Sequence, residues 1–319
     1  MFEPKTVNAL MRHLRESGIS INGSIQKKQL INFGYYHGYK GYRFYRNRNQ
    51  SIPYTEFNQL IGVMEYDNAL KAMMYPVLMF IETAVKNIVC NEIVLGMNTA
   101  SFEAIFREKM SDFTEKKDLM LRRLRLRDEV YKALSREYNN KNKMVEHFYN
   151  KGDDVPIWAI FEILSLGIFS NFVYCLDTES RRSILKKLDM IDVACDSNYQ
   201  LLPKILFELK SLRNAIAHNS VVFDARFKDQ KVSPVLKGWL EKETGINNIS
   251  FYSISDYLIL ICSLLKKIDI NVLRARDLVS EFQSLNISLS LTVSPEIYKL
   301  IDARGAQKKV ELLKEYLKR

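Results

Sequence analysis

One segment, residues 202–218, reads LPKILFELKSLRNAIAH and indicates how this chain folds. Its apolar residues recur at every third or fourth position, which is the spacing of one face of an α-helix. These residues are Leu202, Ile205, Leu206, Leu209, Leu212 and Ile216. The segment therefore predicts an amphipathic helix packed on a core. Arg213 comes four residues after Leu209 and three before Ile216, so its stem should follow the edge of the apolar face.

The composition favours an all-α fold. The 319 residues include only 12 Gly and 7 Pro, which is roughly half of the usual share of about 12%. Few helix breakers and many Leu, Ile, Lys, Glu and Met favour long helices over a turn-rich β-fold. The chain is long enough for one large core or two smaller ones.

Apolar periodicity and helix-start signals predict a series of helices. The longest is expected over 61–95 with a kink at Pro76, and Pro156 suits the first turn of a helix over 156–177. An aromatic loop over 33–48 and a connection over 221–235 interrupt the series. The other helices are expected over 7–17, 25–33, 101–110, 115–138, 180–190, 199–218, 251–268, 272–283 and 295–318.

The sequence gives no sign of export, membrane insertion or metal binding. The N-terminus lacks the apolar run of a signal peptide. The most hydrophobic stretch, 257–265, is far shorter than the roughly 20 residues that span a bilayer. The 4 Cys are scattered, without a Cys-x-x-Cys pair, which is typical of reduced thiols and not of a zinc site. We expect a soluble, cytoplasmic protein without a metal or other cofactor.

The helix over 199–218 ends in groups that suit RNA cleavage. The Arg213 guanidinium can bind a phosphate through two parallel hydrogen bonds, and the His218 imidazole can transfer a proton near neutral pH. Asn214 is their polar neighbour. No metal is needed, because RNA supplies its own nucleophile in the 2′-hydroxyl. Arg213 and His218 point about 140° apart on a helix, so two copies meeting in a homodimer could share one site.

The net charge of +10 favours a polyanionic partner such as RNA. Basic residues concentrate between 116 and 143, and two interpretations stay open. One is a solvated helix face with ion pairs such as Arg125 with Glu129. The other is a ridge that follows RNA phosphates. The candidates for the ridge are Arg122, Arg123, Arg125 and Arg127.

Aromatic rings alternate with cations in residues 33–48, which read FGYYHGYKGYRFYRNR. This pattern suits stacking on unpaired bases, but it equally suits packing of the N-terminus onto the helices. His37 has the same two interpretations and is not counted as catalytic. The candidates for RNA contact are Tyr35, Tyr36, Tyr39, Lys40 and Arg43.

Three segments resemble the Abi family of bacterial abortive-infection proteins, whose helical core belongs to the HEPN superfamily of ribonucleases. Residues 30–42, LINFGYYHGYKGY, are similar to the family's Gly-Tyr-Tyr element. Residues 156–167, PIWAIFEILSLG, are similar to its Trp-x-x-x-Glu-x-x-Ser-x-Gly element. Residues 213–218, RNAIAH, match its Arg-Asn-x-x-x-His signature. Their order and spacing also fit, over about residues 25–225.

The resemblance implies a helical bundle, homodimerisation and metal-independent RNA cleavage. It makes Arg213 and His218 the catalytic pair, with Asn214 as polar support. It divides the chain into an N-terminal helical and aromatic segment (1–60), a HEPN-like core (61–225) and a C-terminal helical extension (226–319). Many relatives have a second His and an Arg shortly after the signature. Here Asn219 and a valine at 221 or 222 stand there, which puts a shared substrate preference or rate in doubt.

Three other matched positions have structural interpretations. Trp158 is expected in the core, and Glu162, in the same element, is also taken as structural. Glu82 resembles an acidic position in the family's first long helix, where we expect an ion pair on the helix surface with Lys86, one turn later.

The sequence thus predicts an endoribonuclease of abortive-infection phage defence. It would cleave single-stranded RNA to a 2′,3′-cyclic phosphate and a 5′-hydroxyl. The alternative is a non-catalytic RNA-binding or protein-interaction module of a toxin–antitoxin or defence system. A constitutively active toxin would kill its host, so we expect a silencer that a phage event relieves. The silencer could be an antitoxin protein, a small RNA or residues 226–319.

Overall fold

The computed structural model describes residues 6–46, 50–112, 116–228, 230–268, 272–302 and 305–319. Within these ranges every regular element is a helix, and the β-type pairings are isolated bridges such as that between Phe44 and Ser51. The predicted all-α fold is confirmed. None of the described helices combines the length and the hydrophobicity needed to cross a membrane.

The described helices follow one another along the chain in this order. Up to residue 175 they are α1 (Val7–Glu16), α2 (Gly23–Phe33), the π-helix η1 (Gly34–Lys40), α3 (Phe57–Met97), α4 (Phe102–Glu108), α5 (Lys117–Asn139), α6 (Lys143–Asn150), α7 (Ile157–Ile163) and α8 (Leu166–Cys175). After it come α9 (Thr178–Lys187), α10 (Leu201–Ala217), α11 (Pro234–Thr244), α12 (Ile254–Ile268), α13 (Leu273–Thr292), α14 (Pro295–Ile301) and α15 (Ala306–Lys318).

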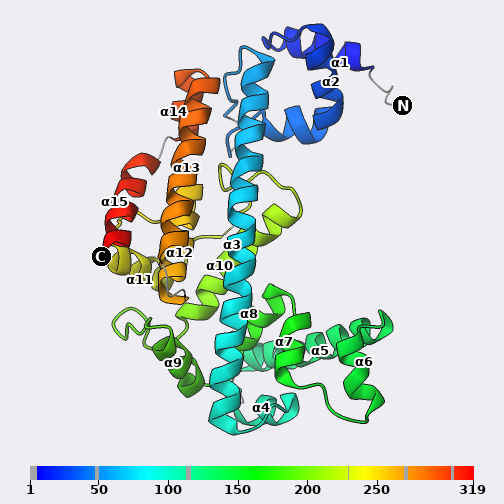
Figure 1. Ribbon diagram of the computed structural model, residues 1–319, viewed down its shortest axis with the longest axis vertical. Helices are drawn as coiled ribbons and strands as arrows, with labels where there is room; N and C mark the ends of the chain where they lie inside the picture. The colour runs from blue at the N-terminus through cyan, green and yellow to red at the C-terminus, as the bar shows by residue number, and fades with distance from the viewer. Residues whose placement is uncertain (1–5, 47–49, 113–115, 229, 269–271, 303–304) are drawn as a thin grey trace.

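Helix α3 organises the fold. It runs along the long axis of the molecule, with α1 and α2 near its first residues and α4 to α7 near its last (Figure 1). A capping box between Glu56 and Gln59 starts the helix, which continues through Pro76. Its 41 residues make a helix about 60 Å long. Helices α7 to α10, α12 and α13 all pack against it. Helix α3 therefore contacts helices of the expected core (61–225) and helices of the expected C-terminal extension (226–319).

Several helix boundaries differ from the prediction for local reasons. The helix expected over 156–177 is broken into α7 and α8, because Leu164 is extended and Ser165 caps α8 by accepting a hydrogen bond from the Ile168 N–H at 3.3 Å. The helix expected over 295–318 is likewise two helices, and Gly305 precedes the second with a φ of 68°. Helix α13 extends to Thr292, beyond the predicted end at 283.

Three elements of the fold were not predicted from the sequence. Residues 34–40, expected in a loop, form the π-helix η1, and α6 and α11 were not expected. Helix α11 has an ordinary start signal, since Pro234 occupies its first turn after Ser233.

The prediction that Trp158 lies in the core is wrong. Its side chain is 48% exposed on α7, and its ring forms a T-shaped pair with that of Phe148, with centroids 5.7 Å apart.

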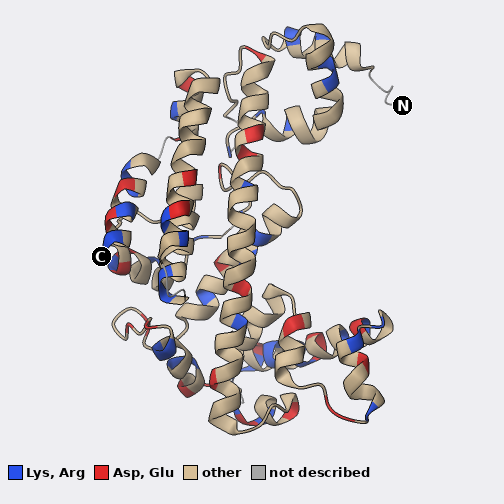
Figure 2. Ribbon diagram, viewed as in Figure 1, with Lys and Arg blue, Asp and Glu red and all other residues tan. Residues whose placement is uncertain are grey.

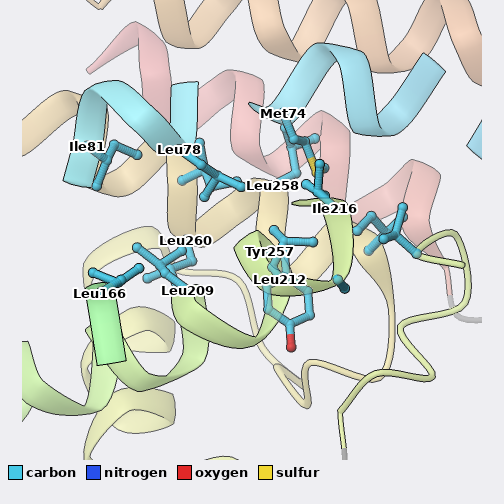
Figure 3. Packing of buried hydrophobic residues seen from close by; sticks show 14 of the residues in the cluster. Met74, Leu78, Ile81, Leu166, Leu209, Leu212, Ile216, Tyr257, Leu258 and Leu260 are labelled. Carbon is cyan, nitrogen blue, oxygen red and sulfur yellow. The ribbon is translucent and has the colours of Figure 1, made fainter. Parts of the chain in front are cut away.

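The apolar face of α10 is buried, as the spacing of residues 202–218 predicted, and it packs against α8, α3 and α12. Figure 3 shows Leu209, Leu212 and Ile216 of α10 next to α3 and α12 residues such as Met74 and Leu258. All six residues of the predicted stripe are buried. Burying a Leu or Ile side chain contributes about 1.5–3 kcal/mol, so this interface fixes how α10 is rotated about its axis. That rotation decides where Arg213 points.

Asp67, a buried carboxylate on α3, binds two other segments of the chain: residues 222 and 223, which follow α10, and Tyr42. Asp67 is fully buried and accepts hydrogen bonds from the N–H groups of Val222 and Phe223 at 2.8 and 2.7 Å. Its other oxygen accepts a hydrogen bond from the Tyr42 hydroxyl at 2.7 Å and pairs with Lys71 at 2.8 Å. Burial, and secondly Asp67, raise the pKa of Tyr42, so its hydroxyl stays protonated and donates.

Candidate functional site

The backbone at the end of α10 presents His218 to solvent. His218 is the C-terminal cap, and Asn219 follows it in the left-handed region with a φ of 52°. The Asn219 N–H donates to the carbonyl of Ile216 at 3.0 Å, and the Ser220 N–H donates to that of Ala215 at 2.8 Å. These two bonds define a Schellman motif, in which Asn is a common left-handed residue. His218 is exposed as a result.

Arg213, in the last turns of α10, faces a carboxylate of α3. Its Nε lies 3.6 Å from Glu82 Oε2, and neither atom has a hydrogen-bond partner among the described residues. Nη1 donates to Asn214 Oδ1 at 3.3 Å. The side chain is 28% exposed, and no described residue accepts from Nη2. The guanidinium is thus held from one side and open on another.

Glu82 is shared between two cations. Besides Arg213 it pairs with Lys86 at 3.0 Å, and Lys86 also donates to the carbonyl of Leu164 at 2.8 Å. The ion pair predicted from the sequence is present, but it is not on the surface, because the Glu82 and Lys86 side chains are 10% and 9% exposed. The Glu82 carboxylate thus lies between the Lys86 ammonium and the Arg213 guanidinium and attracts both.

Asn219 connects the end of α10 to two segments distant in sequence. Its Oδ1 accepts from Lys71 of α3 at 2.9 Å, and its Nδ2 lies 3.0 Å from His37 Nε2 of η1. Because an amide nitrogen only donates, His37 Nε2 is the acceptor. From the sequence, His37 was not counted as catalytic, and Lys71 was not a candidate for any site. The structure places both beside the residue that follows His218.

No hydrogen bond or ion pair joins Arg213 to His218 among the described residues. Arg213 lies beside Glu82 of α3, and Asn219, which follows His218, contacts Lys71 of α3. These two α3 positions are about 16 Å apart along the helix axis. The divergence of Arg213 and His218 expected from helical geometry stays a prediction.

The aromatic segment divides into buried and exposed rings. Tyr39 is 1% exposed, so its ring is covered and belongs to the packing of the N-terminus. Tyr36 is 82% exposed. Tyr35 is half-buried, with the exposed Lys40 ammonium 5.6 Å from its ring centroid. The Arg43 guanidinium lies over Tyr39 at 5.7 Å. Tyr36 and Lys40 are exposed and Tyr35 and Arg43 are partly exposed, so these four candidates retain a surface that a base or phosphate could reach.

The four arginines of α5 also differ. Arg123 donates to the backbone carbonyls of Phe106 and Ser111, so it fastens α4 to α5. Arg127 pairs with Glu103 at 3.2 Å. Arg125 is exposed, and no ion pair joins it to Glu129, although the structure describes both residues.

Arg122 is the member of the set whose contacts suit a binding site. Its Nε donates to Asn171 Oδ1 at 3.1 Å, and its guanidinium lies 3.8 Å from the centroid of the Tyr174 ring. It is half-buried and faces α8 and α10. Lys and Arg are otherwise interspersed with Asp and Glu over the molecule (Figure 2). Among the described residues, no three His, Cys, Asp or Glu side chains gather closely enough to hold a metal ion.

Comparison with known families places these residues in context. The sequence profile of one family, described as Abi-like protein, matches residues 28–224, which is more than half of the chain. The chain belongs to the Abi-like protein family. The match includes η1, α3 and all of α10 with His218, while α11 to α15 lie beyond it. No curated protein and no solved structure matches the chain significantly.

Membership in the Abi-like family suggests a role in abortive infection. The matched range contains the three segments whose resemblance to Abi proteins was noted from the sequence. In the folded chain His37 of the first segment lies beside Asn219, which directly follows the third segment.

Proposed function

We propose that this Abi-like protein is an endoribonuclease of the HEPN type that cleaves single-stranded RNA during abortive infection. The RNA 2′-hydroxyl attacks the adjacent phosphorus, the P–O5′ bond breaks, and a 2′,3′-cyclic phosphate and a 5′-hydroxyl result. His218 accepts the proton from the 2′-hydroxyl, and the same group of one or the other subunit returns a proton to the leaving 5′-oxygen. Arg213 stabilises the charge that develops on the phosphoryl oxygens.

The observation that carries this proposal is the contrast between the two side chains at the end of α10. His218 is exposed and has no side-chain hydrogen bond with any described residue, so it is free to exchange protons with a bound molecule. Arg213 is oriented by Glu82 and Asn214 and keeps Nη2 open. A preoriented cation and a freely accessible base are what transesterification of RNA requires.

A homodimer completes the proposed site. One chain holds Arg213 and His218 on different sides of α10, so a phosphate bound by Arg213 of one subunit would meet His218 of the other. A composite site of this kind makes activity depend on association.

The mechanism predicts that cleavage requires the 2′-hydroxyl and persists in excess chelator. Replacing the ribose on the 5′ side of the cut by 2′-deoxyribose removes the nucleophile, so cleavage there should stop, while neighbouring positions are still cut. EDTA should leave the rate unchanged, because Arg213 and His218 supply the charge and the proton transfer. Mass spectrometry should find the 2′,3′-cyclic phosphate. Loss of activity in EDTA with recovery in magnesium or manganese would contradict the proposal.

The composite site predicts complementation between two inactive variants. Arg213→Ala and His218→Ala homodimers should both be inactive, but a mixed dimer has one site with an intact Arg213 and an intact His218. Mixing the two purified variants should therefore restore cleavage, and dilution to monomers should abolish it. A mixture that stays inactive after subunit exchange has been verified would overturn the composite site.

One observation favours the alternative, a non-catalytic RNA-binding module. The Arg213–Glu82 ion pair and the contacts of Asn219 also hold α10 on α3, which is a structural role. Production of the parent and of His218→Ala in the cell separates the two functions. A ribonuclease is toxic, and the variant relieves the toxicity. A binding module retains both its RNA and its effect after the substitution.

A further inference from the structure

A basic groove lies along α10 beside the residues discussed above. It has a volume of about 850 Å³ and is bounded by α5, α10, residues 227 and 228, and residues 230–234. Its basic lining residues are Arg122, Lys204, Lys210, Lys228 and Lys231, and Glu208 is the acidic residue among the described ones. Of these lining residues, only Arg122 was predicted from the sequence to contact RNA.

Most of this positive charge is available to a ligand. Glu208 is already engaged, because it accepts from Lys228 at 2.5 and 2.6 Å and from the Tyr257 hydroxyl at 2.7 Å. Among the described residues no carboxylate pairs with Arg122, Lys204, Lys210 or Lys231. Four cations without a carboxylate partner in the described part of the chain favour a ligand with several negative charges.

Aromatic rings lie beside the cations of the groove, and one of these rings, Phe207, lines it. The Arg122 guanidinium lies between Tyr174 and Phe207, 3.8 and 5.3 Å from the ring centroids. The ammonium groups of Lys204 and Lys210 lie 5.8 Å from the centroids of Tyr174 and Phe207, respectively. Rings beside cations are typical of surfaces that bind single-stranded nucleic acid, where bases stack and phosphates pair.

The groove occupies the face of α10 that ends at His218. Phe207, Ser211, Asn214 and His218 follow one another at intervals of four, three and four residues, so they share one side of the helix. Phe207 and Ser211 line the groove, whereas Arg213 is turned toward Glu82. The distance along the axis from Lys204 to His218 is about 21 Å, which is long enough for several consecutive nucleotides.

We propose that this groove binds the sugar-phosphate backbone of single-stranded RNA and leads it along α10 to His218. This inference rests on the proposed ribonuclease function, for which it names the path of the substrate. The three lysines bind successive phosphates, and Arg122 contributes Nη1, which no described residue accepts from. The groove contacts are equal in the bound substrate and in the transition state, so they set affinity and not the rate of the chemical step.

Binding to a full-length His218→Ala protein tests the path without any need for cleavage. The probe is a short fluorescein-labelled single-stranded RNA, and its anisotropy is followed over a series of salt concentrations. Adding Lys204→Gln, Lys210→Gln and Lys231→Gln should weaken binding at least about tenfold. The slope of log affinity against log salt should fall by about 2, since each phosphate contact on a single strand contributes about 0.7.

Two matched variants control for charge and folding. Lys186→Gln, Lys299→Gln and Lys308→Gln remove the same charge from exposed positions on α9, α14 and α15. The slope of log affinity against log salt for this triple variant should match that of the parent to within about 0.7, the contribution of one phosphate contact. The second control, Lys204→Arg with Lys210→Arg and Lys231→Arg, keeps the positive charge and should bind RNA with the affinity of the parent. If the two Gln triples bind alike, the groove is not the path. If a mononucleotide displaces the RNA as effectively as an unlabelled strand, the groove is a nucleotide pocket and the proposal is overturned.

The result is independent of catalysis. If the groove variants lose RNA as expected while the parent cleaves nothing, the groove stands and the ribonuclease proposal fails. If the parent cleaves RNA and the groove variants keep the parental affinity and salt slope, the path is wrong and the ribonuclease stands.

Discussion

His218→Ala should lower the rate of RNA cleavage by about a thousandfold or more and leave the melting temperature unchanged. A positioned acid–base group contributes about 10²–10⁴-fold to a proton transfer, and the proposed reaction needs two such transfers. The side chain is exposed and has no side-chain hydrogen bond with a described residue, so its removal breaks no packing. Surface changes of this kind usually alter stability by less than about 0.5 kcal/mol. Single-turnover cleavage of labelled RNA and thermal unfolding measure the two effects.

His147→Ala is the matched control, because His147 is also exposed and lies on α6, outside the proposed site. It should cleave RNA at the parental rate. His37→Ala removes the ring that lies beside Asn219 and should have a smaller effect than His218→Ala, since His37 only supports the end of α10. If His218→Ala cleaves as fast as the parent, or if His147→Ala is equally impaired, His218 is not the acid–base group.

The features that local sequence determines were predictable. The apolar spacing from Leu202 to Ile216 is a local property, and it correctly gave both a helix and its buried face. The same spacing implied that Arg213 follows the edge of that face, where Glu82 meets it. Both inferences succeed because they depend only on residues within a few turns of one another. The divergence of Arg213 and His218 that helical geometry implies stays a prediction.

Features that depend on distant contacts could not be read from the chain. His37 and Asn219 are 182 residues apart, so no local pattern brings them together. Tyr39 and Tyr36 carry the same side chain in one short segment, yet only packing against α3 and its neighbours decides that one is buried and the other exposed. The basic groove has the same origin, because Arg122 meets Lys204 only when α5 and α10 are folded together.

Some failures had a local signal that was misjudged. Trp158 was expected in the core because it is large and apolar, but α7 has only 7 residues and buries Ile157, Ala159, Ile160 and Phe161 instead. A short helix can turn only part of its surface inward. Ser165 is a favourable N-cap residue and could have marked the break between α7 and α8, but the apolar residues on both sides made one continuous helix the simpler prediction.

Asp67→Ala should reduce the free energy of unfolding by about 3–5 kcal/mol, the usual effect of removing one partner from a buried ionic network. The substitution leaves the N–H groups of Val222 and Phe223 without their acceptor and the Lys71 ammonium without its carboxylate. Tyr42 also loses the acceptor of its hydroxyl. Urea denaturation followed by circular dichroism measures the change, with the midpoint expected to fall and the slope to stay the same.

Asp67→Asn should be less destabilising than Asp67→Ala. The amide oxygen can still accept from the Val222 and Phe223 N–H groups, but the amide nitrogen then faces the Tyr42 hydroxyl and the Lys71 ammonium, where an acceptor is needed. Asp128→Ala, at an exposed position of α5, is the control and should change stability by less than about 0.5 kcal/mol. Hydrogen exchange should show the largest loss of protection at Val222 and Phe223 in Asp67→Ala. A loss of stability below about 1 kcal/mol, or unchanged protection there, would mean that contacts other than those of Asp67 hold residues 222 and 223 on α3.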